Sequence, residues 1–177
     1  INKEGESFIS HVALARIDMV PGLDIVAASR TTHQVFVFDH TGATLPGWPQ
    51  PVENNIRAGV VVGDLEADMD FEIVAIDEMG VIYVWKTDGS ELIDGDANPA
   101  TPGVFKRLTG ATFHYSTPAL ADIDNDGKDE IIVGTQADQL YAFNKDGSNV
   151  PGFPVALGSD MAGSAAVGDV DGDGDLE

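Results

Sequence analysis

A run of acidic residues near the middle of the chain has the spacing of a metal-binding loop. Residues 122–130 place carboxylates at the first, third, fifth, eighth and ninth positions, around Gly127 at the sixth. Five acids within nine residues repel one another unless a cation lies among them. The run offers oxygen ligands and neither His nor Cys, which favours a hard ion, and its flexible spacing favours Ca²⁺ over Mg²⁺.

The same frame recurs at residues 169–177 and, in a weaker form, at residues 64–72. The candidate calcium ligands are Asp122, Asp124, Asp126, Lys128 (through its carbonyl) and Glu130; Asp169, Asp171, Asp173, Asp175 and Glu177; and Asp64, Glu66, Asp68, Asp70 and Glu72. The third set is the weakest because Met69 stands in the glycine position, where a positive φ would strain it. The sequence therefore predicts two to three bound Ca²⁺ ions.

An EF-hand is the main alternative for these loops, since it shares the opening D-x-D-x-D-G. That motif needs a bidentate Glu at its twelfth position, where this chain has Val133 in one loop and Ala75 in another. The closing acid comes at the ninth position instead. Short β-branched apolar runs follow, at residues 131–134 and 73–76, and these predict strands rather than helices. Each loop is therefore expected to join two strands.

The formal net charge of −21 bounds the classes of partner. Fifteen of the thirty acidic residues lie in the three acidic loops, so bound calcium would offset much of the charge. The rest predicts a strongly acidic surface, which argues against nucleic acid as a partner. That surface has two interpretations, solubility in a salty setting or an acidic binding face.

The chain has no cysteine and no apolar run near the ~20 residues that span a bilayer. It opens at Ile1 rather than Met, which indicates a mature or excised piece. Calcium loops of this type need roughly millimolar calcium, which the cytosol does not supply. We therefore expect a secreted or cell-surface location.

Aligning the chain on its loops exposes a longer repeat. The loops start at residues 16, 64, 122 and 169, and short strands with turn signals fill the intervals. In the third interval these are residues 119–123, 130–135 and 139–143, then a D-G turn and a proline-bearing edge strand from Pro151. Four-stranded units of this length, without helical periodicity, predict an all-β fold built from β-propeller blades of four antiparallel strands.

These residues resemble the FG-GAP/VCBS repeat family, the calcium-loop propellers of integrin α-subunits and many bacterial exported proteins. The resemblance rests on the three acidic loops, the strand after each, the LYAF strand with its D-G turn, and the PGWP and PGFP segments. It implies that each loop joins the first two strands of a blade and binds Ca²⁺ on one face of the disc. The motif is specific for fold and poorly specific for function.

The repeats divide the chain into units at about 10–57, 58–115, 116–162 and an incomplete 163–177. About three and a half blades do not close a ring, because propellers have four to eight. We therefore expect a fragment of a longer propeller, whose remaining blades come from the rest of the chain. Completion of the ring by another chain is the alternative.

Other positions carry weaker expectations. In the first unit Arg16 replaces the leading ligand, and its guanidinium is expected to take the place of the ion by pairing with Asp18 or Asp24. The four histidines share no metal-ligand spacing, and His114-Tyr115-Ser116 has no partnered base. Residues 92–113 depart from the repeat and hold Lys106 and Arg107, as a surface insertion or as part of a recognition site.

Two functions remain open at this point. The first is a non-catalytic, calcium-stabilised module that recognises a protein or polysaccharide through propeller loops, as integrins and fungal lectins of similar fold suggest. The alternative is the propeller part of, or an accessory to, a secreted polysaccharide-degrading enzyme. A lyase would need a base and a cation at the substrate carboxylate, and that site would lie outside this segment.

Overall fold

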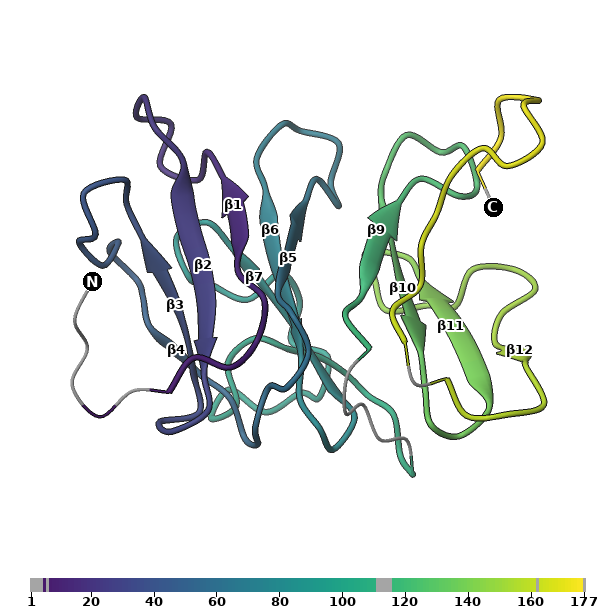
Figure 1. The fold of residues 1–177 in the computed structure, drawn as a ribbon, viewed down its shortest axis with the longest axis horizontal. Helices are drawn as coiled ribbons and strands as arrows, with labels where there is room; N and C mark the ends of the chain where they lie inside the picture. The colour runs from purple at the N-terminus through teal and green to yellow at the C-terminus, as the bar shows by residue number, and fades with distance from the viewer. Residues whose placement is uncertain (1–4, 6, 111–115, 162, 177) are drawn as a thin grey trace.

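The protein is all-β. The computed structural model describes residue 5 and residues 7–110, 116–161 and 163–176, and over these ranges it contains twelve strands and no helix. The strands form three four-stranded antiparallel sheets, each built from consecutive strands (Figure 1). The expected fold class, blades of four antiparallel strands, is confirmed.

Each sheet runs in chain order from its first strand to its fourth. The first sheet contains β1 (Ala13–Ala15), β2 (Asp24–Ser29), β3 (Gln34–Phe38) and β4 (Gln50–Pro51). The second contains β5 (Val61–Gly63), β6 (Glu72–Ile76), β7 (Val81–Lys86) and β8 (Val104–Arg107). The third contains β9 (Ala119–Ala121), β10 (Glu130–Gly134), β11 (Gln139–Phe143) and β12 (Val155–Ala156).

The three sheets lie side by side, and their first strands are next to one another. β1 contacts β5, and β5 contacts β9, so these strands lie next to one another while the fourth strands are the edges (Figure 1). This is the arrangement of neighbouring propeller blades. The short edge strands β4 and β12 follow the PGWP and PGFP segments, as the prolines predicted.

The core lies between the sheets. Trp48 of the first sheet packs edge-on against Trp85 of the second, with ring centroids 5.9 Å apart, and its Nε1–H donates to the Thr87 carbonyl at 3.0 Å. Between the second and third sheets, Phe105 and Phe143 are fully buried within one apolar cluster. Burial of each such side chain stabilises the fold by about 1.5–3 kcal/mol, so neighbouring blades hold one another in place.

Two parts of the chain differ from the expected repeat. The departure at residues 92–113 contains a regular strand, β8, which completes the second sheet by pairing Val81 with Arg107. The first strand of a fourth blade, expected just before Asp169, is not formed within the described residues. There Ala165 and Val167 pack against the outer face of the third sheet.

None of the described residues forms a helix that is long and apolar enough to cross a membrane.

Candidate cation-binding loops

The acidic loops lie at one end of the sheets. Each joins the first strand of a sheet to the second. Because the three sheets repeat one strand order and lie side by side in the same orientation, the loops emerge on the same face (Figure 1). The loops at residues 16–24, 64–72 and 122–130 therefore form one acidic surface.

Asp122 organises the loop at residues 122–130. Its Oδ1 accepts a hydrogen bond from the Asp126 N–H at 3.0 Å, and its Oδ2 accepts one from the Gly127 N–H at 2.9 Å. The turn needs left-handed backbone at Asn125 (φ 60°) and Gly127 (φ 88°). Asn and Gly are the residues that adopt this conformation most readily, so the local sequence determines the fold of the loop.

Three of the expected ligands converge in this loop. Asp122, Asp124 and Glu130 each offer a carboxylate oxygen, and these oxygens lie within 4.8 Å of one another. Two oxygens on one Ca²⁺ ion, each about 2.4 Å from it, lie at most about 4.8 Å apart. The three carboxylates can therefore share one ion.

Glu130 is the buried member of the three. It is 1% exposed, and its Oε2 accepts a hydrogen bond from the Ile123 N–H at 2.9 Å. Burial, followed by the charges of Asp124 and Asp122, raises the pKa of Glu130 to about 7. A cation among the three carboxylates would stabilise the ionised form and lower that pKa.

Asp126 lies outside this group of three. Its Oδ2 accepts a hydrogen bond from Lys128 Nζ at 2.7 Å, and its Oδ1 accepts one from the Lys128 N–H at 2.9 Å. The Lys128 ammonium lowers the pKa of the Asp126 carboxyl. Lys128, expected to contribute its carbonyl, thus also neutralises the neighbouring acid.

The loop that begins at Asp169 brings a second group together. Carboxylate oxygens of Asp169, Asp171 and Asp173 lie within 4.8 Å of one another, and all three residues are exposed. Asp169 Oδ2 accepts from the Gly174 N–H at 3.1 Å, as Asp122 does in the loop before. Asp175 accepts a hydrogen bond at 3.1 Å from the amide of Asn125, so the two loops touch. The expected ligand Glu177 lies outside the described residues.

The loop at residues 64–72 has the same backbone but a different charge pattern. Asp64 accepts from the N–H groups of Asp68 (3.1 Å) and Met69 (2.9 Å), and Met69 takes the positive φ, 70°, expected at the glycine position. Glu66 pairs with two ammonium groups, Lys86 Nζ at 2.6 Å and Lys145 Nζ at 3.3 Å. This loop also contains Asp70. Among the described residues, however, no three of its carboxylates converge as they do in the loops that begin at Asp122 and Asp169.

The first loop is closed by a carboxylate and not by arginine. The buried Asp24 accepts hydrogen bonds through Oδ2 from the N–H groups of Ile17 (2.7 Å) and Asp18 (3.0 Å). Arg16 is exposed and forms no salt bridge with any described residue. The expectation that Arg16 replaces the ion is wrong, because its guanidinium pairs with neither Asp18 nor Asp24. Both carboxylates accept hydrogen bonds from backbone N–H groups instead.

A buried carboxylate at the ninth position is common to the three loops. In each, it accepts a hydrogen bond from the N–H of the second position: Asp24 from Ile17, Glu72 from Leu65 and Glu130 from Ile123. Sequence reasoning treated the ninth position as a ligand and missed this closing bond. The persistence of an acid at Asp24, in a loop without acids at its first and fifth positions, was the available signal.

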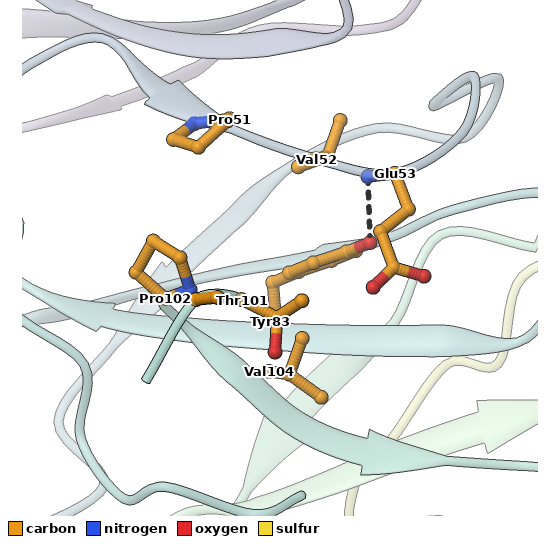
Figure 2. A pocket seen from close by; sticks show the side chains of 8 residues that line it. Pro51, Val52, Glu53, Tyr83, Thr101, Pro102 and Val104 are labelled. Carbon is orange, nitrogen blue, oxygen red and sulfur yellow. Dashed lines mark hydrogen bonds between the residues drawn. The ribbon is translucent and has the colours of Figure 1, made fainter. Parts of the chain in front are cut away.

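The insertion of the second sheet lines a small pocket beside the first sheet. The Arg107 guanidinium forms two hydrogen bonds with Glu53, at 2.8 and 2.6 Å, and two with Asp96, at 2.7 and 3.2 Å. The Tyr83 hydroxyl accepts from the Glu53 N–H at 2.9 Å (Figure 2). It also donates to Asp77 at 3.0 Å. The pocket, of about 110 Å³, is lined by Pro51, Val52, Glu53, Tyr83, Ala100, Thr101, Pro102 and Val104. Its size admits a single small side chain.

His114 and Tyr115, which invited a nucleophile interpretation, lie outside the described residues.

A family model for the FG-GAP-like repeat matches residues 122–177. This part of the chain is similar to the FG-GAP-like repeat. The match begins at Asp122, the residue around which the third loop is folded, and it includes both groups of three converging carboxylates. The resemblance inferred from the acidic loops is therefore confirmed over the FG-GAP-like segment. No curated protein matches the chain in sequence.

Solved structures share the fold at low sequence identity. BBS1N, in its complex with ARL6DN, gives a TM-score of 0.57 at 12% identity over 89% of this chain and 42% of that one. The computationally designed Ika4 protein gives 0.60 at 10% identity over 100% of this chain and 92% of that one. A protein of unknown function from Bacteroides caccae gives 0.50 at 13% identity, over 94% and 52%. The chain thus spans less than half of BBS1N, and at these identities the likeness shows the fold alone.

Proposed function

We propose that this chain is a calcium-binding, non-catalytic propeller module, secreted or displayed on a cell surface, which recognises a protein or polysaccharide. The observation that carries the proposal is the convergence of Asp122, Asp124 and Glu130, whose carboxylate oxygens lie within 4.8 Å of one another. All-oxygen ligands on a flexible loop suit Ca²⁺ better than Mg²⁺, which demands rigid octahedral geometry.

The role proposed for calcium is structural. The ion would neutralise carboxylates that otherwise repel one another, including the buried Glu130, and would tie the start of β10 to the end of β9. At ten times its Kd, each bound ion adds about 1.4 kcal/mol to the free energy of unfolding. Two ions then supply about 3 kcal/mol out of a typical total of about 5–15 kcal/mol.

The proposed location follows from the affinity expected of such loops. Exposed carboxylate loops of extracellular modules bind calcium with Kd values of about 0.1–1 mM. The three acids of the group at residues 169–173 are exposed, which supports an affinity of this class. A role in recognition is supported by fold-level analogy, since the BBS1N structure is a complex with another protein, ARL6DN.

Calcium titration by calorimetry tests the proposal. The wild-type chain should bind two ions, and a D122N/D124N variant should bind one, because it loses two charged ligands. Asparagine at position 122 keeps one of the two oxygens that accept backbone N–H groups there. Asp88→Asn is the matched control, since Asp88 is an acid of a hairpin turn that accepts from Ser90. Absence of calcium uptake by the wild type, or an unchanged ion count in D122N/D124N, would contradict the proposal. Turnover of an acidic polysaccharide by the chain would refute its non-catalytic part.

A further inference from the structure

An apolar groove opens between the first two loops of the acidic face. It has a volume of about 560 Å³ and lies between loop 16–24, loop 64–72 and the strands β1 and β5. Its apolar lining is formed by Leu14, Met19, Leu23, Val62, Met69 and Phe71. We call it the methionine groove. The volume lies in the range of ligand-binding pockets.

The two methionines are displayed at a cost in backbone free energy. Met69 is 81% exposed and Met19 is 61% exposed, and both have left-handed backbone, with φ of 70° and 61°. The third loop has Gly127 and Asn125 at the corresponding positions, where such φ values are easily adopted. Two loops thus place a flexible apolar side chain where the backbone disfavours it and water surrounds it. Methionine is suited to variable apolar contacts because it is unbranched and polarisable.

Negative charge adjoins the groove. Phe71 lines both the methionine groove and a neighbouring polar pocket whose other walls include Asp68, Asp70 and Glu72. Asp68 and Asp70 are exposed and form no salt bridge with any described residue. A ligand that fills the groove with an apolar side chain therefore meets carboxylates immediately beside it.

We propose that the methionine groove docks a cationic amphipathic segment of a partner protein. Apolar side chains of that segment would enter between Met19 and Met69, and a flanking lysine or arginine would pair with Asp68 or Asp70. Arg16 also lines the groove and sets the direction of docking, because a cationic residue of the partner avoids it. This inference rests on the recognition role proposed above, and it names the chemistry of the partner.

The charge of the chain favours this occupant over two others. A second copy would bring together two molecules of formal net charge −21, and anionic lipid would repel the same surface. A basic segment is attracted to it instead, and its apolar face adds the binding free energy that charge alone does not provide.

The test uses the whole chain and a synthetic probe. The probe is a helical peptide of about 18 residues, with Leu on one face and Lys on the other. Its binding is followed by the methyl NMR signals of the four methionines, Met19, Met69, Met79 and Met161. The signals of Met19 and Met69 should shift on titration. Those of Met79, in the turn at the opposite end of β6, and of Met161 should not.

Affinity measurements identify the source of binding. In M19S/M69S the Kd for the probe should rise about tenfold or more, since this variant loses apolar contact at unchanged charge. Met79→Ser is the control, since Met79 is comparably exposed (59%) and should leave Kd unchanged. An unchanged Kd in M19S/M69S would show that the probe is held by charge alone and would overturn the proposal, as would dimerisation through the groove or binding to anionic vesicles. Calcium titration of the same samples reports separately on the proposed function.

Discussion

Replacing Glu130 with Gln should stabilise the protein without calcium and reduce the further stabilisation that calcium provides. The Glu130 carboxyl is 1% exposed, and burial beside other acids raises its pKa from 4.5 to about 7. At 1.36 kcal/mol per pKa unit, the ionised carboxylate costs the ion-free fold about 3 kcal/mol. Glutamine removes that cost and keeps an oxygen that can accept the hydrogen bond from the Ile123 N–H.

The effect depends on pH in a defined direction. Because the folded-state pKa lies above the unfolded value, Glu130 favours the fold when it is protonated. Its contribution is therefore fully present below about pH 4.5 and is lost as the pH rises through about 7. The variant and the wild type should have equal stability at about pH 4, apart from small local differences. They should differ by about 3 kcal/mol at about pH 8.

Urea denaturation in excess chelator measures the difference. With a slope of about 2 kcal/mol per molar urea, the unfolding midpoint of the variant at pH 8 should lie about 1–2 M above that of wild type. Millimolar calcium should raise the wild-type midpoint by more than that of the variant, which keeps only the group at residues 169–173. Glu91→Gln is the matched control, because it removes a carboxylate that accepts from the Gly103 N–H outside the acidic loops. A lower midpoint for Glu130→Gln than for wild type in chelator at pH 8 would refute the reasoning.

Two further predictions concern the second loop and the packing of blades. In K86M/K145M, loss of both ammonium groups from the second loop should allow it to bind an additional calcium ion, and an ion count equal to that of wild type by calorimetry would contradict this. Gly47→Ala should lower the free energy of unfolding by about 2 kcal/mol more than Gly152→Ala in a urea melt. Both glycines have positive φ, 82° and 98°. A Cβ at Gly47 would lie 1.9 Å from the Asp88 carbonyl oxygen of the neighbouring sheet, whereas one at Gly152 would meet nothing within 4 Å. Equal losses for the two variants would show that this close approach does not limit stability.

The strands and turns of the fold could be predicted because their signals are local. The alternating runs at Gln34–Phe38 and Gln139–Phe143 became β3 and β11 with the expected bounds. β8 could not be predicted in the same way. It lies in the segment that breaks the repeat, and it is a strand because β7 offers an unpaired edge there.

The candidate site likewise has a part that local sequence predicts and a part that it does not. Asp122 and Asp124 lie two residues apart in a tight turn, so their convergence follows from the sequence itself. That Arg16 does not pair with Asp24 could not be predicted, because the partner of Asp24 depends on the folded loop. There the Ile17 N–H donates to Asp24 Oδ2 at 2.7 Å.

By itself, the sequence determined the repeat, the all-β class and the acidic loops, since each strand and loop that recurs is encoded within about ten consecutive residues. Only the tertiary structure decided which acids are neutralised and where apolar side chains gather. Because the sheets pack side by side, Lys145 donates to Glu66, which lies 79 positions away in the sequence. For the same reason Met19 and Met69 line one groove. Such contacts depend on the spacing between blades, which no local pattern specifies.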